Sequence, residues 1–155
     1  MRAFIQVVQM ETKFNFKSQI CTTREQSEKL LALGLKKETA DMVIYYSELY
    51  GVDRAYVNDI FEEAPSFDID DIPAWSLGRL IEMLPSVIKL KEGLPTLYPY
   101  AFLDLSQVAV SYTWNDYDAE DRNLAGFYGN GLFAAIVDAF EWLIKEGCFP
   151  KEYLV

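Results

Sequence analysis

The sequence contains no histidine and only two cysteines, and these scarcities exclude several kinds of active site. Histidine is the usual general base near neutral pH and the commonest protein ligand of zinc. Ser-His-Asp catalysis, Cys-His catalysis and histidine-bound metals are therefore excluded. Cys21 and Cys148 lie far apart in the chain, and we expect both to be ordinary small core residues rather than a disulfide or a nucleophile.

The sequence also lacks a long hydrophobic run. No stretch approaches the roughly 18 apolar residues that a membrane-spanning helix needs. The apolar start at Ala3–Val8 is interrupted by Gln6, and no small-residue cleavage site follows it, so it does not match a signal peptide. We therefore expect a soluble, unprocessed, cytoplasmic protein without membrane association.

Basic residues are few, with 14 Lys and Arg against 24 Asp and Glu and a formal net charge of −10. Such a field repels the phosphate backbone of nucleic acids, so we expect no direct nucleic-acid binding. It attracts basic protein surfaces or hard cations instead. A basic protein partner is the kind of partner that this charge favours.

The chain has 155 residues, of which 51% are hydrophobic and 15% aromatic, enough for one domain over residues 1–155 to bury a real core. Within it, residues 51–72 are acidic and without clear periodicity, which predicts an irregular surface segment.

Three helices are expected from caps and apolar spacing, and a fourth is suggested. Thr23 with Gln26 predicts the start of a helix over 24–33 that ends at Gly34. Ser76 begins a second helix that ends at Pro85. Apolar residues recur around most of residues 131–146, with Asn130 as the cap and Gly147 as the end, which predicts an enclosed core helix. The suggested helix starts near Lys37, with Met42, Val43 and Tyr46 on its apolar side.

Four strands are expected. Residues 3–9 and 13–17 are rich in β-branched and aromatic residues, and residues 97–105 and 107–114 read as neighbouring strands. Val108, Val110, Tyr112 and Trp114 share one face of the last of these. The fold class is therefore α+β, a small antiparallel sheet packed against a long C-terminal core helix with additional short helices.

Two motifs are interpreted as structural rather than functional. Residues 129–134 match the Gly-x-Gly-x-x-Gly/Ala spacing of dinucleotide-binding turns, but they follow an acidic stretch with no expected strand. Residues 115–121 alternate carboxylates as a calcium loop does, yet an EF-hand needs Gly and Glu where this chain has Asp121 and Phe127. We interpret them as a turn with a cap and as a solvated loop.

Three segments together resemble known proteins. They are Thr23-Arg24-Glu25-Gln26-Ser27 through Leu33-Gly34-Leu35 with Ala40-Asp41-Met42, Pro73-Ala74-Trp75-Ser76-Leu77-Gly78 through Leu84-Pro85, and Ala139-Phe140-Glu141-Trp142-Leu143-Ile144 before Gly147. Over these segments the chain resembles a group of small uncharacterised proteins of gut bacteria and their phages or mobile elements. The resemblance implies shared caps and core helices, and it carries over no activity, cofactor or functional residue.

These observations favour a non-catalytic accessory or interaction protein with an acidic surface for a basic protein partner. A narrower form is a nucleic-acid mimic, and an alternative from another class is a metal-dependent hydrolase that uses the Asp68 or Asp116 carboxylates. Homo-oligomerisation through residues 131–146 is a third hypothesis. No catalytic residue, cofactor or metal ligand is assigned. The candidate interaction surface consists of Asp68, Asp70, Asp71, Asp116, Asp118, Tyr112 and Trp114.

Overall fold

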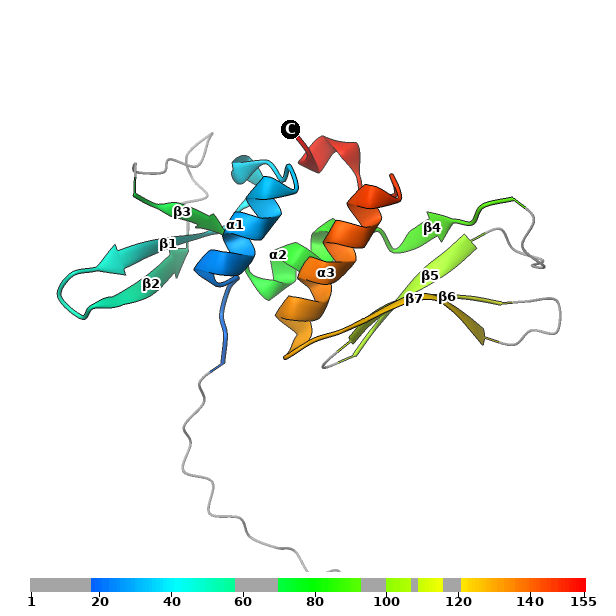
Figure 1. The fold of residues 1–155 in the computed structure, drawn as a ribbon, viewed down its shortest axis with the longest axis horizontal. Helices are drawn as coiled ribbons and strands as arrows, with labels where there is room; N and C mark the ends of the chain where they lie inside the picture. Colours follow the sequence, from blue (N-terminus) through cyan, green and yellow to red (C-terminus); the bar gives the residue numbers. More distant parts are fainter. Residues whose placement is uncertain (1–17, 58–69, 93–99, 107–108, 116–120) are drawn as a thin grey trace, which may run out of the picture.

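Two antiparallel sheets lie on either side of a group of three helices (Figure 1). The computed structural model describes residues 18–57, 70–92, 100–106, 109–115 and 121–155. One sheet has the strand order β2-β1-β3 and the other the order β4-β5-β6-β7. The α+β class with a long C-terminal helix packed on an antiparallel sheet is confirmed. The strands expected at residues 3–9 and 13–17 lie outside the described residues.

Helix α1 (Arg24–Ala32) begins as the sequence predicts. The Thr23 hydroxyl accepts a hydrogen bond from the Gln26 amide, and the Gln26 side chain accepts one from the Thr23 amide, which together satisfy two amides of the first turn. The helix ends where Gly34 adopts a φ of 97°, which brings the Leu35 amide to the Leu30 carbonyl at 3.1 Å.

The helix suggested near Lys37 is wrong. Residues Lys37–Thr39 form a single 3-10 turn, and the chain then enters strand β1 (Met42–Ser47). The run of β-branched and aromatic residues there suits a strand, and antiparallel pairing with β2 and β3 stabilises that strand over a helix. Asp41, expected inside a helix, instead accepts hydrogen bonds from the Ser76 amide at 2.8 Å and the Ser76 hydroxyl at 2.5 Å.

The irregular course expected for residues 51–72 is wrong at both ends of that segment. Strand β2 (Val52–Val57) pairs with β1 through all its residues, and strand β3 begins at Ile72 and ends at Ala74. The sequence does not predict β2, because nearly all its side chains are exposed and it therefore lacks the apolar alternation that marks a strand. Residues 58–69 lie outside the described part of the chain.

The four-stranded sheet contains the two C-terminal strands that the sequence predicts and two that it does not. Strands β5 (Tyr100–Leu105) and β6 (Ala109–Asn115) are confirmed as antiparallel neighbours. Strand β4 (Val87–Lys89) and strand β7 (Asp121–Tyr128) complete the sheet. β7 occupies residues that the calcium-loop comparison treated as loop, and it leads directly into the turn of residues 129–131.

Helix α2 (Leu77–Met83) is capped by Ser76 as predicted, and helix α3 (Leu132–Lys145) fills the predicted core position. Asn130 is not the cap of α3; Gly131, at a φ of 102°, holds that position without a side-chain bond. Gly129 lets the turn approach the helix closely, because a Cβ there would lie 2.8 Å from the Ala134 Cβ. Since β7 is antiparallel to β6, this glycine turn is not part of a dinucleotide-binding βαβ unit.

The main core lies between α3 and the inner face of the four-stranded sheet. Tyr112 on β6 and Trp142 on α3 stack with ring centroids 6.1 Å apart, and Phe140 contacts Phe149 at 4.7 Å. The apolar residues of α3 are thereby used inside one chain, which removes the reason for expecting oligomerisation through residues 131–146. Those buried on α3 are Phe133, Ala135, Ile136, Val137, Ala139, Phe140 and Leu143.

We expect Phe140→Ala to lower the free energy of unfolding by about 3–5 kcal/mol, because it removes a fully buried ring from the core. Phe102→Ala is the matched control, since that ring is 47% exposed on the outer face of β5 and should cost about 1 kcal/mol or less. Urea denaturation of both variants measures the difference. Similar losses for the two variants would show that the core is not where the structure places it.

Glu141 on α3 links that helix to α1 and carries a pH-dependent contribution. Lys145 and Lys29 lie 2.7 and 2.9 Å from its carboxylate and lower its pKa to about 2. Because this pKa is below the unfolded value near 4.3, the contribution is present above about pH 5 and is lost as the pH falls toward 2. We therefore expect Glu141→Gln to be less stable than the parent at pH 7 and equally stable near pH 2. Thermal unfolding of both proteins across this range tests it, and a constant difference between them from pH 7 to pH 2 would contradict it.

Candidate functional site

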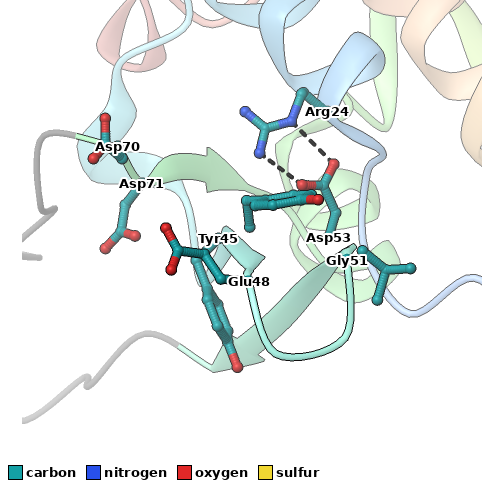
Figure 2. Close-up of a pocket in the computed structure, with 9 residues that line it drawn as sticks. Arg24, Tyr45, Glu48, Gly51, Asp53, Asp70 and Asp71 are labelled. Atoms are coloured by element: carbon teal, nitrogen blue, oxygen red, sulfur yellow. Dashed lines mark hydrogen bonds and ion pairs between the residues drawn. The ribbon is translucent and has the colours of Figure 1, made fainter.

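An open groove lies on the three-stranded sheet where β3 stops short. β3 pairs with Met42–Ile44 of β1 only, so the described strands leave the same side of Tyr45–Ser47 without a neighbour. The groove there has a volume of about 800 Å³ (Figure 2). Its walls come from the start of α1, the adjoining ends of β1 and β2 with the turn between them, and the two residues before β3: Arg24, Tyr45, Tyr46, Glu48, Gly51, Val52, Asp53, Asp70 and Asp71.

Three carboxylates gather at one side of this groove. Asp70 and Asp71 precede β3, while Glu48 comes from the turn after β1, and Figure 2 shows all three on the side away from Arg24. Asp71 accepts a hydrogen bond from the Tyr56 hydroxyl at 3.3 Å. No ion pair joins Glu48 or Asp70 to any residue that the structure describes.

The opposite wall holds the one guanidinium of the groove, and its charge is already matched. Arg24 donates two hydrogen bonds to the Asp53 carboxylate, at 2.7 and 3.0 Å. This pairing raises the pKa of Arg24 and lowers that of Asp53. The lining therefore contains four carboxylates and one cation, and the cation is held by one of the four.

Tyrosine rings supply the apolar part of the surface. Tyr46 is 59% exposed in the groove, and Tyr45, which also lines it, packs against Tyr56 with ring centroids 5.6 Å apart. Nearby, the Arg54 guanidinium lies 3.9 Å from the centre of the Tyr50 ring. This hairpin thus already contains one contact between an arginine and a tyrosine face, the geometry that a basic ligand could repeat.

The structure divides the candidate surface expected from the sequence. Asp70 and Asp71 lie in the groove, whereas Asp68, Asp116 and Asp118 lie outside the described residues. Tyr112 is wholly buried and Trp114 is 9% exposed, so the interpretation of these two rings as an interaction surface is wrong. They share the face of β6 that α3 covers, and the Tyr112 hydroxyl donates to the Pro85 carbonyl at 2.8 Å.

The other groove residues have only weak signals in the sequence. Tyr46 is expected on the apolar side of the suggested helix, and this assignment hides its relation to Asp70. Glu48 and Gly51 belong to the turn between β1 and β2, and Gly51 has the positive φ of 64° that such turns favour. A glycine after a tyrosine-rich run is the signal that could have indicated a hairpin.

Neither cysteine has the environment of a reactive thiol. Both are free, Cys21 is buried as expected of a core residue, and Cys148 is partly buried against the main core. Burial raises the pKa of both thiols, and a nearby carboxylate raises each further: Asp41 for Cys21 and Glu146 for Cys148. A raised pKa keeps a thiol protonated, and the protonated form is a poor nucleophile.

Metal binding finds no support within the described residues, where no three Cys, Asp or Glu side chains are close enough to hold an ion together. The described helices include none that is long and apolar enough to cross a membrane.

Comparisons with protein-family models, curated proteins and solved structures find no match for this chain. The geometry of the groove is therefore the basis for a functional proposal.

The contact between Arg24 and Asp53 should contribute modestly to stability, because both side chains are more than a third exposed. In a double-mutant cycle with Arg24→Gln and Asp53→Asn, we expect a coupling free energy of about 0.2–1 kcal/mol at low salt. The coupling should shrink in 1 M NaCl because salt screens exposed charges. Chemical denaturation of the four proteins measures it, and a coupling of zero at low salt would contradict the geometry.

Proposed function

We propose that this protein is a non-catalytic accessory protein whose groove binds a lysine- or arginine-rich segment of a protein partner. The observation that carries the proposal is the charge of the groove. Among the described residues that line the groove, Glu48, Asp70 and Asp71 are accompanied by one cation, Arg24, which is already paired with Asp53. A ligand that brings positive charge is the one that this lining favours.

The rings beside the carboxylates suit the same ligand. A guanidinium or ammonium group is attracted to the face of a tyrosine as well as to a carboxylate, and Tyr46 is exposed in the groove to offer such a face. The long aliphatic part of lysine or arginine can also pack on these rings while its charged end reaches an acid. Acids and rings together therefore select basic side chains over small cations.

The net charge of −10 supports the same proposal at longer range. An acidic field raises the rate at which a basic partner arrives, and it keeps nucleic acids away. Because salt screens this field, binding should weaken as ionic strength rises. We place the encounter in the cytoplasm, where the two free cysteines would stay reduced.

The proposal is tested with a fluorescent nona-arginine peptide as the probe of basic ligands. We expect the double variant Glu48→Gln/Asp70→Asn to bind it about tenfold more weakly than the parent, which corresponds to about 1.4 kcal/mol. Tyr46→Ala should also weaken binding, since it removes the exposed ring. Fluorescence anisotropy at physiological salt gives the dissociation constants.

The matched control removes the same charge elsewhere. Glu38→Gln/Glu152→Gln changes two exposed acids outside the groove and should alter affinity less than about twofold. Arg24→Gln should act in the opposite direction, because it releases Asp53 and makes the groove more acidic. Equal losses of affinity for the two double variants would mean that peptide binding depends only on net charge, and the groove proposal would then be rejected.

A narrower form of this proposal is that the partner's basic segment is itself a nucleic-acid-binding surface. The protein would then act as a nucleic-acid mimic, with Asp70 and Asp71 standing where phosphates would lie. Duplex DNA should displace this protein from such a partner, and it should leave the complex intact if the partner's segment has another role.

A further inference from the structure

Strand β2 is an open edge of the three-stranded sheet. It pairs with β1 through its full six residues, and no other described strand lies on its outer side. Sheets usually protect such edges with charged side chains, proline, a bulge, a short strand or a covering helix or loop. The sequence of β2, Val52-Asp53-Arg54-Ala55-Tyr56-Val57, has two charged residues but no proline and no lysine, and its pairing with β1 has no irregularity.

The direction of the free backbone groups follows from the neighbouring pair. Pro73 lies opposite Val43 and has no N–H, so these two residues cannot form a hydrogen-bonded pair. The N–H and C=O groups of Val43 therefore point to the other side of β1, toward β2. Its partner Tyr56 and every second residue from it therefore bond to β1. The residues whose N–H and C=O groups face the open edge are Asp53, Ala55 and Val57.

We propose that two copies of this chain associate by antiparallel pairing of β2 with β2, with Ala55 on the two-fold axis. The two three-stranded sheets then form one continuous six-stranded sheet. The Ala55 residues exchange hydrogen bonds with each other, and Asp53 of one copy exchanges them with Val57 of the other. This interface goes beyond the ligand proposed for the groove, although Val52 and Asp53 of β2 also line the groove.

Charge selects this register among the symmetric ones. Pairing centred on Asp53 or on Arg54 places identical charges directly opposite each other, which is destabilising. Centred on Ala55, the pairing sets Arg54 opposite Tyr56 on one face and Asp53 opposite Val57 on the other, so no like charges meet. A register centred on Tyr56 keeps only three residues of β2 paired.

The edge itself suits a copy of this chain better than a strongly basic segment. It carries one acid and one base, so its charge is balanced, unlike the acidic groove. In this register the exposed side chains of Tyr56 in the two copies lie on the diagonal across the two-fold axis, within reach of each other. Burying these side chains adds apolar contact to the backbone pairing.

The register is tested by cysteine cross-linking of the full chain. Residues in a hydrogen-bonded antiparallel pair have Cα atoms about 5.5 Å apart, within the range of a disulfide. Because Ala55 packs against the cluster that contains Cys21, the variants carry Cys21→Ala as well, and Ala55→Cys should then give a covalent dimer of twice the 17.8 kDa chain mass under mild oxidation. The matched control is Arg54→Cys. In this register position 54 of one copy lies diagonally from position 54 of the other, at about 7–8 Å, so this variant should not cross-link. The parent, with Cys21 and Cys148, gives the background.

Light scattering then tests the interface without a cross-link. The parent should be a dimer at high micromolar concentration, and Ala55→Pro should be a monomer, because proline removes an edge N–H and leaves the ladder to β1 intact. Circular dichroism checks that the variant is folded; if it is not, the cysteine pair decides. The proposal is overturned if the parent stays monomeric at millimolar concentration, if a folded Ala55→Pro still dimerises, or if Arg54→Cys cross-links as fast as Ala55→Cys.

Discussion

Burial of helix α3 is the constraint on which the rest of the structure depends. Its apolar residues extend around most of the helix, so it is stable only where other elements cover several of its sides. The four-stranded sheet covers one side through Val110, Tyr112 and Trp114, and α1 and α2 contact others. The ring of Phe149, from the C-terminal segment, packs against Phe140 near the end of α3. This arrangement uses the most apolar part of the chain internally.

The three-stranded sheet buries far fewer side chains than the four-stranded sheet and α3 do. Its own cluster is small, made of Cys21, Met42, Ile44 and Ala74, and it joins the main core where Ala74 is followed by the fully buried Trp75. The Trp75 carbonyl accepts from the Thr22 amide and its indole N–H donates to Thr39, which ties the sheet to the start of α1 and to the turn before β1. With so small a cluster, the hairpin of β1 and β2 keeps several rings at the surface. The groove and the open edge both arise from this exposed hairpin.

Charge and exposed rings in the groove act together rather than separately. A carboxylate alone attracts any cation, and an exposed ring alone attracts any apolar group. Where Asp70, Glu48 and Tyr46 surround one space, a side chain that is both basic and long satisfies both preferences. The pairing of Arg24 with Asp53 contributes by removing the one internal cation that would compete with such a ligand.

The sequence alone determined the elements whose signals are local. The cap formed by Thr23 and Gln26, the cap at Ser76 and the apolar circumference of α3 each depend on residues within a few positions of one another, and the structure confirms all three. The alternation of Val110, Tyr112 and Trp114 likewise predicted a strand, because period-two spacing is local. Asp70 and Asp71, which the charge excess singles out, both line the groove.

Only the tertiary structure decided which face each strand buries and which segments become strands by pairing. Tyr112 and Trp114 looked like an exposed ring surface, but α3 packs on that face, and alternation by itself does not say which side meets the core. Residues 42–46 had apolar positions that fit a helix, and pairing with β2 and β3 made them a strand. The groove exists because residues distant in the chain, Arg24, Tyr46 and Asp70, meet through that pairing, and such contacts depend on long-range geometry that no local pattern contains.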